Sequence, residues 1–418
     1  MRSAALAVLV VLVALAARGD GRAGLASESA SGPPQSASVL AYVWDGRPLL
    51  VRVDAVTLRA RSRALDLGQP PISRWVRSPE GDRLALGSGN GARLKFVDLR
   101  AMRRLSTLDL GPKGFVAGLA WPSPRRVVAA VSGARVEVVV VDPQTRRLLA
   151  RHRLPGAGAV TQAARSPGGL VLLLSPQNRI GPATLALATP TGLRTTMLPL
   201  EAGIDPPAVS EPGLAVSPDG RRAIIVPGGA RVLEVDLRTL AITERELSEP
   251  VSLLGQLHSW LDPAASAKGP LEGPARSAAW VSAHRVVVAG WNYRPTGERT
   301  MVSEAAGVRL IDTRNWSVRT LAQGASSTLV AGDTLLAFGG THGQGLRGIG
   351  LQAFGPDGRE RFHLFEDRFV AVVTAVGRYA YVSEQSQAQT RIQVVDITSG
   401  RVIRTVRKQT YIDILKLD

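Results

Sequence analysis

The sequence predicts an all-β protein built from repeated four-stranded antiparallel units. Short apolar runs rich in Val and Leu, bounded by Gly, Pro, Asp and Ser, dominate the chain, which is typical of strands and turns. One unit is clear in Leu214–Leu247. There an apolar run leads into a Ser-Pro-Asp-Gly turn, followed by an apolar strand, a Gly-rich loop, a strand ending in Val-Asp and a last alternating strand. Such units arranged radially make a β-propeller.

Eight units follow from Val39 onward, and a turn between the first and second strands marks each unit after the first. Its clear forms are Ser78-Pro79-Glu80-Gly81, Ser123-Pro124, Ser166-Pro167-Gly168-Gly169 and Ser217-Pro218-Asp219-Gly220, and its weaker forms are Ser282-Ala283-His284, Ala331-Gly332-Asp333 and Val376-Gly377. Pro fixes φ and Gly accepts positive φ, so both residues suit a tight turn. The repeat count predicts eight blades, with seven as the alternative.

An aspartate closing the third strand is the second marker. It stands at Asp54, Asp98, Asp142, Asp236, Asp312 and Asp396. The first three are 44 residues apart, a length typical of a propeller blade. A ring of ligands is conceivable, but we expect each carboxylate to cap the backbone N–H groups of the turn that follows it. Units four and seven depart from this marker, with Ala188-Thr189-Pro190 and Gly355-Pro356-Asp357-Gly358.

The two ends of the propeller region complement each other. The first unit begins at its second strand, Val39–Trp44, and the chain finishes with the alternating segment Tyr411–Lys416. We therefore predict that the C-terminal strand completes the first blade and closes the ring non-covalently.

The first residues have the features of an export signal. Arg2 precedes the apolar run Ala4–Ala17, which is short for a transmembrane helix, and small residues follow. We predict a signal peptide over 1–26, with an uncleaved anchor as the alternative, a flexible Ser/Pro/Gly linker over 27–38, and the propeller domain over 39–418. No other segment has the length and hydropathy to span a bilayer. The protein is thus expected to be secreted, periplasmic or attached to the cell envelope. The sequence contains no Cys, which removes disulfides, thiolate chemistry and cysteine-linked lipid from consideration.

The chain is strongly basic, with a formal net charge of +17 from 51 Lys+Arg and 34 Asp+Glu. Such a charge favours anionic surfaces such as wall polymers, phospholipid headgroups or nucleic acid. Because the Arg residues are scattered over every repeat, a solvated basic surface is the preferred interpretation. Export argues against nucleic acid as the partner.

These turns, third strands and spacings resemble secreted bacterial propellers of the YVTN or WD-repeat-like class, over about 39–418. The resemblance implies the architecture and leaves function open, because such propellers include sugar lactonases, amine dehydrogenase heavy chains, surface-layer proteins and binding modules. Trp-Asp occurs once, at Trp44-Asp45, and Gly-His does not occur, so the repeated signatures of typical WD repeats are missing. No catalytic residue is therefore carried over from any of them.

Long insertions in units five to eight mark the candidate site, because function is usually grafted onto loops. They are Glu249–Ala275, with a short helix expected over Val251–Leu261, Trp291–Ala306, Gly339–Gly350 and Glu384–Thr390. We predict that they line one rim of the channel mouth, where Trp260, Trp291, Tyr293, Arg294 and His342 bind a ligand. Aromatic faces beside Arg and amide donors suit sugars, peptides or aryl ligands. Packing of the aromatic residues is the competing interpretation.

No enzymatic motif stands out. The five His residues show no metal-ligand spacing, and His152, His284 and His363 fall in predicted strands. We predict no catalytic residue, no metal ligand and no cofactor. The sequence favours a binding or scaffolding module at the cell envelope, with an unknown protein, peptide or glycan as partner. The alternative is a lactonase-like hydrolase with a metal in the central channel.

Overall fold

The computed structural model describes residues 37–415 except 70, 112, 155, 157, 206–207, 249–273, 298–299, 343–345, 371, 386–389 and 409–410. The predicted signal peptide, most of the linker, the predicted helix Val251–Leu261 and Trp260 therefore lie outside the described residues.

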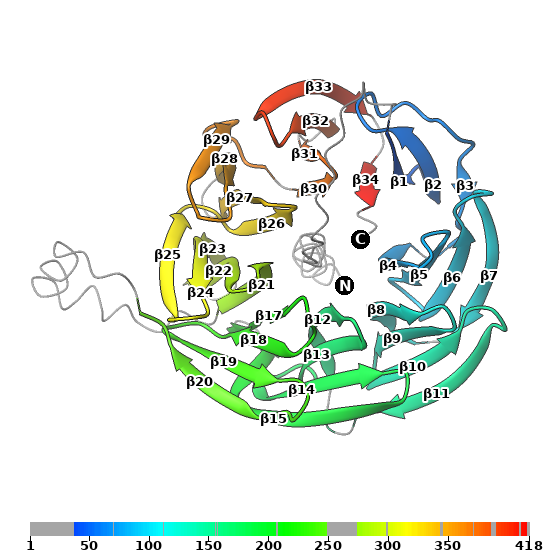
Figure 1. The fold of residues 1–418 in the computed structure, drawn as a ribbon, viewed down its shortest axis with the longest axis horizontal. Helices are drawn as coiled ribbons and strands as arrows, with labels where there is room; N and C mark the ends of the chain where they lie inside the picture. Colours follow the sequence, from blue (N-terminus) through cyan, green and yellow to red (C-terminus); the bar gives the residue numbers. More distant parts are fainter. Residues whose placement is uncertain are drawn as a thin grey trace, which may run out of the picture.

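Eight four-stranded antiparallel blades form a closed ring, which confirms the predicted fold class and blade count (Figure 1). From the inner to the outer strand, the first four blades are β34 (Tyr411–Leu415), β1 (Ser38–Trp44), β2 (Pro48–Asp54) and β3 (Leu65–Asp66); β4 (Ile72–Arg77), β5 (Arg83–Ser88), β6 (Arg93–Asp98) and β7 (Arg103–Asp109); β8 (Phe115–Ser123), β9 (Arg126–Ser132), β10 (Val136–Asp142) and β11 (Arg147–Arg153); and β12 (Ala159–Ser166), β13 (Gly169–Ser175), β14 (Gly181–Thr189) and β15 (Gly192–Asp205).

The other four blades follow the same order with one elaboration. They are β17 (Gly213–Val216), β18 (Arg222–Val226), β19 (Arg231–Asp236) and β20 (Ile242–Glu246); β21 (Pro274–Ser282), β22 (Arg285–Gly297), β24 (Val308–Asp312) and β25 (Ser317–Ala322); β26 (Ser327–Ala331), β27 (Thr334–His342), β28 (Leu346–Phe354) and β29 (Glu360–Leu364); and β30 (Val372–Val376), β31 (Tyr379–Gln385), β32 (Thr390–Asp396) and β33 (Arg401–Lys408). Two further strands, β16 (Ala208–Ser210) and β23 (Thr300–Ala305), are additions to blades 4 and 6.

The C-terminal strand closes the ring as predicted. Strand β34 pairs antiparallel with β1, from Leu40 opposite Leu415 to Trp44 opposite Tyr411. On the other side of this blade, the buried hydroxyl of Tyr381 in blade 8 donates to the carbonyl of Ala55 at 2.9 Å. The ring is therefore closed by main-chain pairing within blade 1, and blade 1 is joined to blade 8 by a side-chain hydrogen bond.

The repeated aspartates cap turns, as expected from the sequence. Each carboxylate accepts hydrogen bonds from backbone N–H groups two or three residues later, in Asp54, Asp98, Asp142, Asp236, Asp312 and Asp396. These bonds favour the ionised form, and they lower the pKa of Asp54 to about 2. The Ser-Pro-Asp-Gly turn is held similarly, because Ser217 Oγ accepts from the Arg222 amide at 2.9 Å and Gly220 has a φ of 70°.

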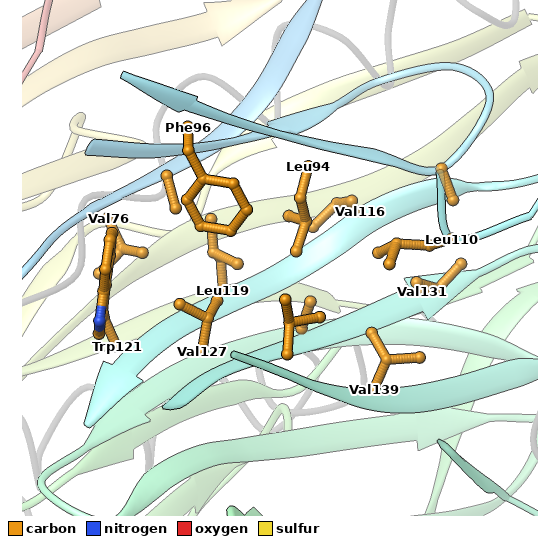
Figure 2. Packing of buried hydrophobic residues seen from close by; sticks show 14 residues of the cluster. Val76, Leu94, Phe96, Leu110, Val116, Leu119, Trp121, Val127, Val131 and Val139 are labelled. Atoms are coloured by element: carbon orange, nitrogen blue, oxygen red, sulfur yellow. The ribbon is translucent and has the colours of Figure 1, made fainter. Parts of the chain in front are cut away.

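The core lies between the blades. One buried cluster fills each of the eight interfaces around the ring. Figure 2 shows the cluster between blades 2 and 3, where Phe96 meets Trp121 edge to face with ring centroids 5.9 Å apart. Both faces of most strands are therefore apolar, which explains why the strands appear in the sequence as continuous apolar runs. No helix in the described part of the chain is long and apolar enough to cross a bilayer.

Candidate functional site

The ring has two unlike faces. The turns joining first to second strands lie on one face, and the hairpins joining second to third strands lie on the other, which we call the hairpin face. In blades 1 and 3 the connections at this face are short, at 45–47 and 133–135. In blades 4 and 6 the strands continue beyond the blade, so the extra strands found among the described residues lie on one half of the hairpin face.

Among the described residues, blade 6 carries the largest elaboration, which we call the extension (Gly290–Gly297 and Thr300–Ala305). Strand β22 pairs with β24 over Arg285–Val288 and then with β23 from Trp291 onward. Strand β23 in turn meets blade 7, where Ser303 pairs with His342 and the Ala305 amide donates to Thr341 Oγ1 at 3.2 Å. Blades 6 and 7 thereby share one nine-stranded sheet.

A glycine permits the start of the extension. Gly290 has a φ of 155°, and a Cβ placed there would lie 1.9 Å from the carbonyl oxygen of Ala275. No side chain fits at that distance, so only glycine lets β22 approach β21 this closely.

Two of the predicted ligand residues pack at the base of the extension. Tyr293 is 9% exposed and clusters with Val209 and Ala275, and Trp291 lies against the same cluster. Val209 belongs to β16, which pairs back onto β15 of blade 4. The link into blade 5 is held there as well, because the Arg276 amide donates to the Glu211 carbonyl at 2.8 Å. Elements of blades 4 and 6 therefore form one packed base on the hairpin face.

Arg276 is a partly buried cation beside this base. Its guanidinium donates to the carbonyls of Ala275 and Trp291 and to Asn292 Oδ1, the last at 2.6 Å. Burial, with a smaller contribution from the charge of Arg309, lowers the pKa of Arg276 to about 10. The group remains protonated at neutral pH, so the base of the extension carries a fixed positive charge.

The inner strands carry further polar side chains that link different blades. Arg165 of β12 donates to the carbonyls of Leu119 in blade 3 and Trp75 in blade 2. Gln162, also of β12, donates to the carbonyl of Arg276 in blade 6 at 3.1 Å. Each side chain reaches a blade beyond its neighbour, so one guanidinium and one amide group tie together the inner strands of blades 2, 3, 4 and 6.

Blade 1 contributes a carboxyl group to the inner ring. Asp413 of β34 lies opposite Tyr42 in the strand pair. Desolvation raises the pKa of Asp413 to about 6, against a partial offset by the backbone N–H of Ile414. Among the described residues, no group of three or more His, Asp or Glu side chains is arranged to hold a metal ion.

The structure brings together part of the site predicted from the sequence. Trp291, Tyr293 and Arg294 lie on β22, and His342 ends β27, which β23 joins to the extension. The side chains of Arg294 and His342, like the whole of Trp260, lie outside what the structure describes. Arg276, Gln162 and Arg165 could not be found from the sequence, because most of their partners are backbone carbonyl oxygens, which leave no pattern in the sequence. His284 lies in the turn after β21, as the turn marker Ser282-Ala283-His284 predicted and contrary to the expectation that it falls in a strand.

No known protein family matches the sequence, and no curated protein does either. Solved structures do match in fold. Dihydro-heme d1 dehydrogenase NirN, in complex with DHE, is 12% identical with a TM-score of 0.58, over 89% of this chain and 74% of that one. BamB from Moraxella catarrhalis is 12% identical with a TM-score of 0.49, over 81% of this chain and 91% of that one. The Pan2 WD40 domain of Neurospora crassa is 13% identical with a TM-score of 0.44, over 75% and 85%. At these identities the likeness concerns the fold, and the chain is an eight-bladed β-propeller.

Proposed function

We propose that this chain is an exported binding module of the cell envelope that recognises a protein or peptide on the hairpin face of blades 4 to 7. The observation that carries the proposal is the pairing of Ser303 with His342. It converts two separate hairpins into one continuous wall, on the half of the face where the extra strands gather.

The wall has the properties of a preorganised binding surface. Its strands are hydrogen-bonded to one another and its base is packed, so little conformational entropy is lost when a ligand binds. The partly exposed Trp291 and Asn292 give this wall an aromatic and an amide group, a combination common in protein and peptide interfaces. The predicted ligand residues Trp291, Tyr293, Arg294 and His342 belong to this wall.

Site-specific photo-crosslinking in the native host tests the proposal. A crosslinking residue is introduced at Val302 in β23 or at Arg347 in β28. The control positions are Asn90, in the short hairpin of blade 2 on the same face, and Arg221, on the opposite face. We expect discrete protease-sensitive adducts from the first two positions only. Adducts that resist protease would indicate a glycan, and equal adducts from Arg221 would overturn the proposal.

Export is tested separately. The mature N-terminus of the protein from its host is determined by mass spectrometry of the envelope fraction. Cleavage within 14–27 supports a signal peptide, whereas an intact N-terminus in the membrane fraction supports the alternative of an anchor, and an intact N-terminus in the cytoplasm contradicts export.

A further inference from the structure

The outer wall of the ring is electrostatically divided. We call the outer strands of blades 8, 1, 2 and 3, with the turns that lead into them, the basic arc; it comprises 397–407, 55–69, 99–109 and 143–153. These segments expose 13 arginines and only two carboxylates, Asp66 and Asp109. The equivalent segments of blades 4 to 7, 190–205, 237–248, 313–323 and 355–369, expose seven arginines and eight carboxylates.

Most of the charge on the basic arc is not neutralised by the protein. Within the described part of the chain, nine of the 13 arginines have no carboxylate within ion-pair distance: Arg59, Arg63, Arg100, Arg104, Arg146, Arg147, Arg401, Arg404 and Arg407. The other half differs, since Arg314, Arg359 and Arg361 each pair with an aspartate. Although arginines occur in every repeat, the excess positive charge of the outer strands is therefore concentrated on four consecutive blades.

The shape of the arc selects among anionic partners. Blades 8, 1, 2 and 3 follow one another around the ring, so their outer strands form a convex wall (Figure 1). A flat bilayer touches a convex wall along one or two blades. The exposed aliphatic side chains of the arc could not all enter one flat bilayer. Leu148 and Leu149 lie in blade 3, whereas Val402 and Ile403 lie in blade 8, three-eighths of the circle away. A flexible chain can follow the whole arc.

We propose that the basic arc binds a linear polyanion, a polymer with a phosphate in each repeat, wrapped along the outer wall from blade 8 to blade 3. Arginine suits phosphate because its planar guanidinium donates two parallel hydrogen bonds. Binding would displace condensed counterions from the polymer, so affinity should fall steeply with salt. This surface is separate from the hairpin face, and the two proposals can fail independently.

The test measures binding of long-chain inorganic polyphosphate to the full chain at several salt concentrations. One variant replaces an unpaired arginine in each blade of the arc, R59Q/R104Q/R147Q/R404Q. The matched control makes the same charge change on the other half, R194Q/R238Q/R319Q/R359Q. We expect the arc variant to bind at least about tenfold more weakly and its salt slope to fall by about 3, with a much smaller change in the control. Thermal melting verifies that both variants fold.

Two further probes identify the source of the anion. Tripolyphosphate, which is too short to span the arc, should bind far more weakly per phosphate than the long chain. Vesicles of phosphatidylglycerol at equal phosphate concentration should bind more weakly than long polyphosphate. Equal losses in the arc and control variants would overturn the proposal, as would absence of polyphosphate binding at about 0.15 M salt. Tighter binding to vesicles would replace the polymer with a membrane.

Discussion

The side-chain amide of Gln162 lies 3.1 Å from the carbonyl oxygen of Arg276, so blade 4 is bonded to blade 6 past the inner strand of blade 5. Strand β17 of blade 5 is only four residues long, and its first residue, Gly213, approaches the backbone of Ser277 in β21 closely. A short inner strand with a glycine at its start leaves room for this contact. The bond is one reason to expect the elaborated half of the ring to be rigid.

Removing the Gln162 donor should destabilise the protein. The side chain is buried, so Q162A should lower the free energy of unfolding by about 1–2 kcal/mol. Q162E should cost more than Q162A, because it keeps the shape but directs an oxygen at the carbonyl oxygen of Arg276. Urea denaturation of the three proteins measures the order. If Q162E were as stable as the parent, the bond would have no energetic role.

Stability should depend on the ionisation of Asp413. Its pKa is about 6 in the folded protein against 3.8 for an ordinary aspartate, so the folded state binds this proton more tightly than the unfolded state. Its contribution to stability is therefore greatest below pH 4 and is lost as the pH rises through 6. D413N should be more stable than the parent at pH 8 by about 3 kcal/mol, and the gain should shrink toward pH 4. Denaturation of both proteins from pH 4 to pH 8 measures the difference in their free energies of unfolding. A difference that does not change with pH would contradict the raised pKa of Asp413.

One turn position is strained in several blades. The fourth residue after the repeated aspartate has positive φ, which is 61° at Arg146 and 67° at the equivalent Gly400. This conformation is sterically unfavourable for residues other than glycine. R146G should therefore stabilise the protein by about 0.5–1 kcal/mol, whereas R147G, in strand β11 of the same exposed segment, should destabilise it by a similar amount. Shifts of the melting temperature in opposite directions would show that the backbone at Arg146 is strained, and shifts in the same direction would show that it is not.

Ring closure can be tested at the chain end and in the seam. A chain ending at Val406 lacks β34 and should lose cooperative unfolding, because β1 then has an unpaired inner edge. Removal of 17–38 should matter far less. The conservative variant Y381F removes only the bond to Ala55 and should cost about 1–3 kcal/mol. A truncated chain that melts like the full chain would show that closure is dispensable.

The extension should depend on Gly290. A methyl group there meets the Ala275 carbonyl at 1.9 Å, so G290A should lower stability by about 1–3 kcal/mol and displace Trp291 and Tyr293. Gly192 is a matched control, since nothing lies within 4 Å of its Cβ position. Intrinsic Trp fluorescence and crosslinking from Val302 should change in G290A and not in G192A.

The sequence by itself determined the blades. The Ser-Pro-Asp-Gly turn, the capping aspartates and the alternation of strands are local features, and local hydrogen bonds and φ values decide them. The closing strand Tyr411–Leu415 was predictable too, because a four-stranded repeat with one strand missing at its start needs the complement at its end.

Only the tertiary structure decided what the insertions and charges do. That Ser303 meets His342, that Gln162 meets Arg276, and that 13 arginines line four consecutive blades all depend on residues far apart in the chain. Two of these contacts are made to backbone atoms, and the third is a gathering of side chains from neighbouring blades. Neither kind leaves a pattern in the sequence of one strand. A repeat unit encodes its own turns and pairing, whereas the ring alone sets which units become neighbours.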